Sequence, residues 1–173
     1  MGLMQVATHT VESGSEVQTV KLESCVTDNS MYFLSANNIC VGADGGSLDV
    51  KPLVGSTSDD TSNINIAWMD LKTSGAYQDF GNTGQDMWRV TDGCTTAPNK
   101  INFVMNLFNW YSSSEWAHIT MEVTSMTSSQ LRGYQQAGTK EETTSFNGIQ
   151  FYTNQTGGGG FQAGSQFTLY KVV

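Results

Sequence analysis

Side chains that commonly act in catalysis are few in this sequence. Histidine is the usual general base, and the chain contains only His9, near its start, and His118, on the polar side of a predicted strand. A cysteine nucleophile would need such a base beside it, and no local signature pairs a cysteine with His118. The cysteines are widely spaced and odd in number, which indicates free thiols in a reducing compartment rather than a disulfide framework or a zinc site: Cys25, Cys40 and Cys94.

The acidic side chains do not form a recognisable site either. Asp59-Asp60 is typical of a solvated turn, and Glu141-Glu142 falls in the least structured stretch, where a catalytic carboxylate pair is not favoured. Four aspartates could lie on neighbouring loops and offer oxygen ligands to calcium, although none has the spacing of an EF-hand loop: Asp44, Asp49, Asp59 and Asp60. We therefore expect a protein that is not an enzyme and has no cofactor and no metal.

Aromatic residues are more informative than ionisable ones. In the segment 100–110, alternate apolar residues fit one buried strand face, while Val104, Phe108 and Trp110 fall on the opposite face. Large apolar groups are unusual on a solvated sheet face, and aromatic residues are favoured at the centres of subunit interfaces. The sequence thus presents Val104, Phe108 and Trp110 as a candidate subunit interface. Coverage of this face by a loop of the same chain is the alternative.

A second aromatic group surrounds three consecutive serines, Ser112–Ser114. Trp110, Tyr111 and Trp116 flank this polar stretch. A loop here would present amphipathic rings at its tip, where they can stack on the apolar face of a sugar. These three residues are a candidate ligand-facing loop, with ordinary loop packing as the alternative.

The composition limits the partners. Charged residues make up 14% of the chain, the net charge is −8, and two arginines and six scattered lysines form no basic stripe that could bind a nucleic acid. No apolar run of about 18 residues is present, so we expect no membrane span, and the N-terminus lacks the features of a secretory signal. The hydrophobic content of 38% favours a folded chain over a disordered one.

Period-two alternation of apolar and polar residues predicts an all-β chain, and no helix of about ten residues is convincing. We expect roughly eight to ten strands in one antiparallel jelly-roll β-sandwich over residues 18–173. Residues 1–17 show no sustained period and predict a flexible or partner-docking arm, and 124–145 predict a long loop that contains a short strand. The clearest strands are expected at 63–71, 100–110, 116–123, 148–152 and 166–172.

The C-terminal part of the chain carries a distinctive pattern. Phe146–Tyr152 reads FNGIQFY, and Phe161–Tyr170 reads FQAGSQFTLY after the glycine run 157–160. This ending resembles the strand pair G-I-x-F and F-x-x-G-S-x-F-x-L-Y that is common in structural proteins of tailed bacteriophages. In that family a short Gly- or Ser-rich hairpin joins the two strands, and Gly usually follows the final Tyr, where this chain has Lys171. The resemblance extends over about residues 18–172 and implies a jelly-roll sandwich.

The resemblance also implies a part of a virion, because family members are head-decoration, neck, baseplate and tail-fibre components. Since the chain is short and shows no coiled-coil shaft, we expect a non-enzymatic capsid decoration or cement protein. It is expected to self-associate, as a trimer by analogy alone, and to bind the major capsid protein or tail components after assembly in the bacterial host cytoplasm. The alternative is a carbohydrate-binding adhesin of a tail fibre or baseplate, and a polysaccharide hydrolase is the third candidate.

Overall fold

The computed structural model describes residues 2–173 except 76, 95, 97–98, 127–129 and 155–158. Within that part of the chain there are thirteen strands and no helix, and therefore no helix that could cross a membrane. The strands are β1 (Leu3–Thr10), β2 (Thr19–Leu22), β3 (Tyr32–Ile39), β4 (Ser47–Val54), β5 (Thr57–Ser58), β6 (Ile64–Lys72), β7 (Tyr77–Gln85), β8 (Trp88–Asp92), β9 (Ile101–Phe108), β10 (Ala117–Met126), β11 (Leu131–Lys140), β12 (Gly148–Thr153) and β13 (Gln166–Val172).

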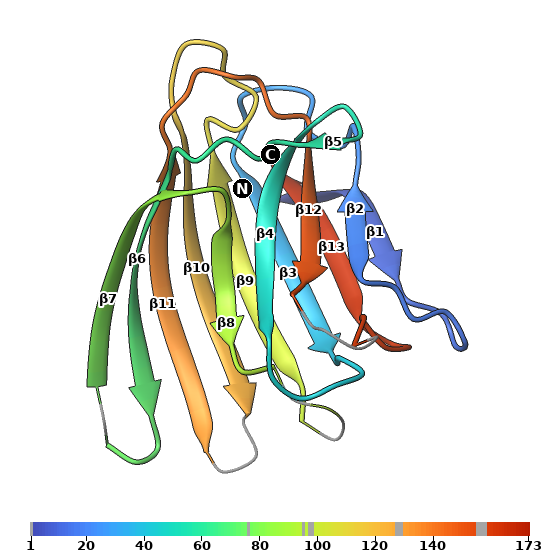
Figure 1. The fold of residues 1–173 in the computed structure, drawn as a ribbon. Helices are drawn as coiled ribbons and strands as arrows, with labels where there is room; N and C mark the ends of the chain where they lie inside the picture. Colours follow the sequence, from blue (N-terminus) through green and yellow to red (C-terminus); the bar gives the residue numbers. More distant parts are fainter. Residues whose placement is uncertain (1, 76, 95, 97–98, 127–129, 155–158) are drawn as a thin grey trace.

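These strands form two antiparallel sheets. The eight-stranded sheet has the order β1-β13-β3-β9-β10-β11-β6-β7, and the five-stranded sheet has the order β2-β12-β4-β5, with β8 also paired to β4. The smaller sheet lies against one face of the larger sheet, and the chain crosses repeatedly between the two layers (Figure 1). The expected all-β sandwich is thus confirmed, with more strands than the eight to ten expected. Jelly-roll connectivity stays a prediction.

The core lies between the sheets and follows from the alternation of apolar residues. Every second residue of β9 and β10 is buried, from Ile101 to Leu107 and from Ala117 to Val123. Phe151 of β12 and Phe167 of β13 stack across the interior, with ring centroids 4.5 Å apart. Phe161 packs edge-on against Phe167 at 5.2 Å.

The two strands of the C-terminal motif lie in different sheets. β12 pairs with β2 and β4, whereas β13 pairs with β1 and β3. The expected hairpin between them is therefore wrong for this chain, and the glycine-rich segment belongs to a connection from one layer to the other. Residues 155–158 of that segment lie outside the described residues. The crossover places the alternate apolar residues of both strands on opposite sides of one core.

The N-terminal segment 1–17 is not a free arm, contrary to the expectation. β1 pairs antiparallel with β13 at one edge of the large sheet, and Gly2 and Val173 exchange two backbone hydrogen bonds of 2.7 and 2.9 Å. The side chain of Val11 joins the core. The sequence signal was absent because most β1 side chains stay exposed at the sheet edge, so no apolar alternation is required there.

The prediction of a long loop with a short strand over 124–145 is also wrong, because β10 continues to Met126 and the ten-residue strand β11 follows at Leu131–Lys140. β11 lies inside the large sheet between β10 and β6. Its inward positions include Gln136, Gly138 and Lys140, which are polar or small and therefore hide the strand periodicity. Gly138 leaves space for an indole: a Cβ at this position would lie 2.4 Å from Nε1 of Trp88.

Replacement of Phe167 tests this packing. Phe167→Ala should lower the free energy of unfolding by about 3–5 kcal/mol, because the ring contacts two other rings and its loss leaves a cavity. Urea unfolding followed by circular dichroism measures the change. Phe80→Ala is the matched control, since the Phe80 side chain is 42% exposed and should lose about 1 kcal/mol or less. Equal losses in the two variants would contradict the described core.

Candidate functional site

Trp110 lies in the core and not on the outward face of the large sheet. Its predicted places in the subunit interface and in the ligand-facing loop are therefore both wrong. Its side chain is fully buried, with ring centroids 5.5 Å from Trp88 and 5.7 Å from Phe146, and its Nε1 donates to the carbonyl oxygen of Gly148 at 3.1 Å. The preceding residue, Asn109, has φ of 55°. This left-handed conformation breaks the strand alternation, so the next side chain turns inward.

Val104 and Phe108 do lie on the outward face of the large sheet, where both are half-buried. Their register neighbours on β10 are Glu122 and His118. The candidate subunit interface therefore retains two of its three residues on one face. A subunit contact at this place stays a prediction.

The candidate ligand-facing loop keeps two of its three rings. Tyr111 and Trp116 are 39% and 47% exposed. The hydroxyl oxygen of Ser112 accepts hydrogen bonds from the backbone N–H groups of Ser114 and Glu115, at 3.3 and 3.1 Å. These local bonds shape the loop that carries the two exposed rings.

The cysteines are core residues. Cys25, Cys40 and Cys94 are free and buried. Burial raises the pKa of the Cys25 thiol to about 11 and that of Cys94 to about 12. Both groups are therefore protonated at neutral pH, and neither has the thiolate character that nucleophilic catalysis needs. His118 is exposed on the outward sheet face.

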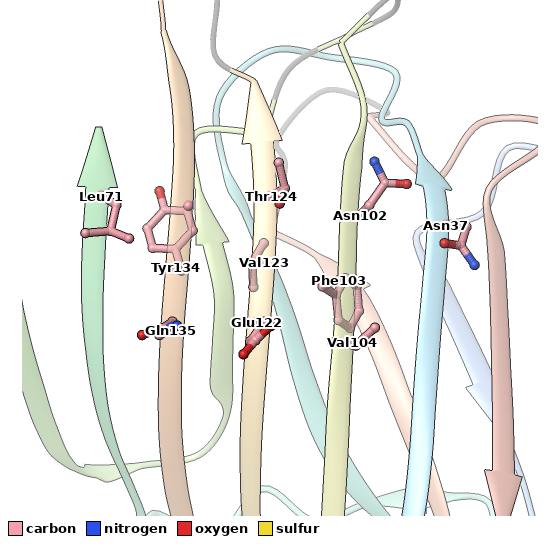
Figure 2. Close-up of a pocket in the computed structure, with 11 residues that line it drawn as sticks. Asn37, Leu71, Asn102, Phe103, Val104, Glu122, Val123, Thr124, Tyr134 and Gln135 are labelled. Carbon is pink, nitrogen blue, oxygen red and sulfur yellow. The ribbon is translucent and has the colours of Figure 1, made fainter. Parts of the chain in front are cut away.

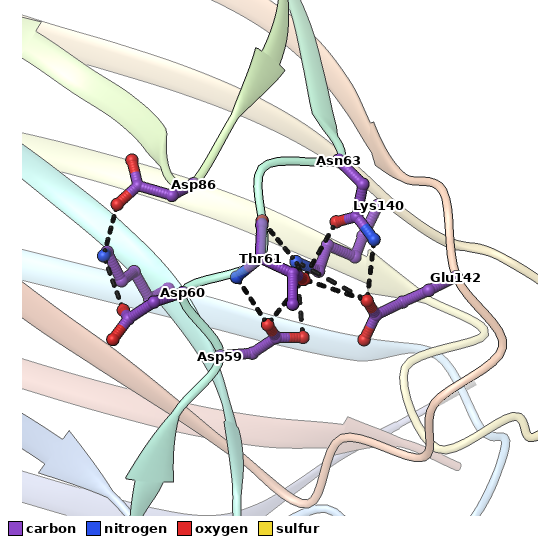
Figure 3. Close-up of polar contacts among 8 residues, drawn as sticks. Asp59, Asp60, Thr61, Asn63, Asp86, Lys140 and Glu142 are labelled. Atoms are coloured by element: carbon purple, nitrogen blue, oxygen red, sulfur yellow. Dashed lines mark hydrogen bonds and ion pairs between the residues drawn. The ribbon is translucent and has the colours of Figure 1, made fainter.

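The most enclosed polar cluster surrounds Lys140 (Figure 3). The Lys140 side chain is fully buried, and its Nζ donates to the carbonyl oxygen of Thr61 at 3.0 Å and to the Thr61 hydroxyl oxygen at 2.6 Å. Carboxylate oxygens of Asp59 and Glu142 lie 3.3 and 3.8 Å from the same nitrogen. Asn63 donates to Glu142 at 2.7 Å. The cluster fastens the segment between β5 and β6 to the end of β11.

The electrostatics of the cluster favour a charged pair. Burial raises the pKa of the Asp59 carboxyl, but hydrogen bonds from the Thr61 hydroxyl and backbone N–H and the positive charge of Lys140 oppose it, and the net effect lowers this pKa to about 2. Asp59 is thus ionised at neutral pH, and it lies beside the ammonium group of the fully buried Lys140 side chain. A charge-neutralised contact of this kind stabilises a fold but supplies no free nucleophile or base.

Two further clusters neutralise charged side chains of β4. Lys51 Nζ donates to Asp60 at 2.6 Å and to Asp86 at 2.7 Å (Figure 3). Arg89 donates through Nε to the buried carboxylate of Asp49 at 3.0 Å. Desolvation raises the pKa of Asp49, and its bonds to Ser47 and Arg89 oppose this effect.

The four aspartates considered for calcium therefore do not converge. Asp49, Asp59 and Asp60 each face a different basic side chain, and Asp44 accepts a hydrogen bond of 2.7 Å from the backbone N–H of Thr96. Among the described residues, no group of three or more His, Cys, Asp and Glu side chains could hold a metal ion. The prediction that Asp59-Asp60 forms an ordinary solvated turn is wrong for Asp59, whose side chain is 9% exposed.

A hollow of about 360 Å³ lies on the outward face of the large sheet, and sequence reasoning did not find it (Figure 2). Gly133 of β11 lies in register between Thr124 of β10 and Leu71 of β6, and no side chain fills this place in the lining of the hollow. Glu122 also borders a second hollow of about 420 Å³. The outward side chains that line the first hollow are Asn37, Leu71, Asn102, Val104, Glu122, Thr124 and Gln135.

Asp59→Asn tests the Lys140 cluster. The variant should have a lower free energy of unfolding at neutral pH, because it removes a negative charge beside a buried ammonium. Since the folded pKa of Asp59 is about 2 and the unfolded value is 3.8, this carboxylate stabilises the fold above about pH 4.

The difference between the natural chain and Asp59→Asn should shrink as the pH falls from 4 toward 2. Urea unfolding at several pH values measures it. Asp44→Asn is a control, because Asp44 contacts only a backbone N–H among the described residues. A difference that does not change with pH would contradict the charged contact.

Comparisons with known proteins identify no relative. The chain significantly matches no protein-family model, no curated protein and no solved structure.

Proposed function

We propose that the chain is a non-enzymatic structural protein of a bacteriophage virion, and specifically a decoration or cement protein of the capsid. The C-terminal motif supports this proposal, because its alternate residues Ile149, Phe151, Phe167 and Leu169 are all fully buried in the core of the sandwich. The motif is thus part of the fold and not an appended tail. The basic groups support it too, since most of them form ion pairs within the fold.

Most basic side chains are engaged within the fold. Of the 8 lysines and arginines, six form ion pairs with carboxylates of the same chain. They are Lys51, Lys72, Arg89, Arg132, Lys140 and Lys171. Pairing of this kind leaves few basic side chains free to act in a reactive centre.

The unpaired edge of β1 is the observation that carries the proposed assembly role. β1 ends the eight-stranded sheet, so one side of its backbone has no partner strand within the described part of the chain. An exposed strand edge is a template for another chain, and lysine or proline commonly protects it. β1 contains neither, and it contains no acidic residue although the chain has a net charge of −8.

Apolar side chains accompany this edge. Leu3, Met4 and Val173 are 56%, 48% and 62% exposed. A bulge between Gln5 and Ala7 interrupts the register with β13, so strand pairing would use the straight runs on either side of it. Because the edge is neutral, a second copy can approach it without opposing like charges, and self-association through β1 is the contact that we propose.

A second candidate function is that of a glycan-binding adhesin in a tail fibre or baseplate. The exposed rings of Tyr111 and Trp116 and the hollow beside Gly133 favour it. Labelling of the protein in purified phage particles separates the two candidates. Label on the head shell supports a decoration protein, whereas label confined to the tail tip supports the adhesin and contradicts the first proposal.

Charge at the edge tests the assembly contact. The double variant Leu3→Lys, Met4→Lys should stay monomeric at concentrations at which the natural chain associates, because two like charges would face each other across the paired edges. Sedimentation velocity over a concentration series measures the oligomeric state. Val54→Lys is the matched control, since Val54 is 48% exposed on β4. A natural chain that is monomeric throughout, or a double variant that associates equally, would refute the contact.

A further inference from the structure

We infer that the hollow around Gly133 and Glu122, on the outward face of the large sheet, binds an uncharged saccharide. The inference goes beyond the assembly role and does not depend on it. The hollow lies over β3, β9, β10, β11 and β6, whereas the proposed assembly contact uses β1 at the edge of the sheet. Saccharide binding at the hollow and self-association through β1 can therefore be tested separately.

The shape of the hollow comes from one glycine. Gly133 has Thr124 and Leu71 as its register neighbours on the two flanking strands. A Cβ built at Gly133 would have its nearest atoms at 3.8 and 3.9 Å, which are ordinary contact distances. The fold therefore does not require glycine at this position for close packing. Its effect is to leave an open depression in a row of outward side chains.

The lining is chemically suited to hydroxyl groups. Sugar hydroxyls donate and accept hydrogen bonds, amide side chains do both, and a carboxylate accepts several. Asn102 and Gln135 contribute amides, and Glu122 contributes a carboxylate. The Oδ1 atom of Asn102 accepts a hydrogen bond of 2.8 Å from the backbone N–H of Asn38, which orients this amide.

Glu122 differs from the acidic residues of the internal clusters. It is exposed on β10, between Val104 and Gln135 in the register, and forms no ion pair with the described residues. Neutral neighbours leave its carboxylate available to a ligand. A carboxylate within an amide-lined depression binds a pair of sugar hydroxyls through charge-assisted hydrogen bonds.

The hollow also offers apolar surface. Leu71 is 45% exposed at one side, and the half-buried side chain of Val104 lies at the other. A pyranose ring presents hydroxyls at its rim and C–H groups on its faces, so a mixed lining of this kind matches both parts. Ligand sites usually combine apolar walls with a few placed polar groups in this way.

Charge selects against other ligand classes. Among the described residues that line the hollow there is no lysine or arginine, and Glu122 is the only charged side chain. Phosphates, sulfates and acidic sugars would meet an unpaired carboxylate with no cation to compensate it. An uncharged saccharide is the ligand class that agrees with both the polar lining and this charge.

Amide chemical-shift titration of the full-length chain tests the inference. The probes are glucose, galactose, mannose and N-acetylglucosamine, each at millimolar concentrations, with glucuronic acid as the anionic probe. At least one neutral sugar should shift the backbone amides of Thr124, Gly133 and Gln135 in a saturable manner. Glucuronic acid should bind more weakly than glucose. No saturable shift with any neutral sugar, or tighter binding of glucuronic acid than of glucose, would overturn the inference.

Two variants locate the site. Gly133→Leu fills the depression without a backbone penalty, because Gly133 is not among the residues with positive φ. It should weaken the affinity about tenfold or more, and Glu122→Gln should weaken it by a smaller factor. Asp79→Asn is the matched control, since Asp79 is an exposed carboxylate on β7 that does not line the hollow. Undiminished binding by Gly133→Leu would overturn the assignment, and folding of each variant is checked from its amide spectrum.

Discussion

The rings of Phe151 and Phe167 meet in the space between the two sheets, and the remaining architecture depends on that contact. A sheet that is apolar on one face must bury it, and the second sheet is the layer that does so here. Because β12 and β13 belong to different sheets, a short stretch of sequence supplies both sides of the central packing. Strands from the rest of the chain pair with both edges of β12 and of β13.

Once the core is closed, every polar group that it encloses needs a partner. Lys140 is an inward residue of an interior strand, and its ammonium is tolerated because Thr61 and two carboxylates surround it. The same requirement explains why Asp49 is bonded to Arg89. These clusters resemble catalytic sites in composition, but their groups satisfy one another, and the outward surface is the part of the molecule left for contacts with others.

Local pattern was a good guide where one strand face is apolar, as in β6, β9, β10, β12 and β13. It failed for β11, whose inward residues are polar or glycine, and for β1 and β7, whose edge positions require little burial. Trp110 was misplaced because alternation was extended past Asn109, where the backbone changes region. The role of Asp59 could not be predicted, since its partner Lys140 is distant in sequence and near only in the folded chain. The hollow beside Gly133 depends on side chains from five strands and had no local signal.

The position of the last strand has a consequence for how the molecule forms during translation. β13 is inserted between β1 and β3, so β1 has no partner in its own sheet until β13, which follows the other described strands in the chain, has been made. The larger sheet therefore cannot be completed before β13 has been synthesised. Long-range pairing of this kind slows folding, because loop closure precedes any stabilising contact. A nascent chain that lacks β13 would leave β1 and the facing edge of β3 unpaired, and unpaired strand edges are prone to aggregation.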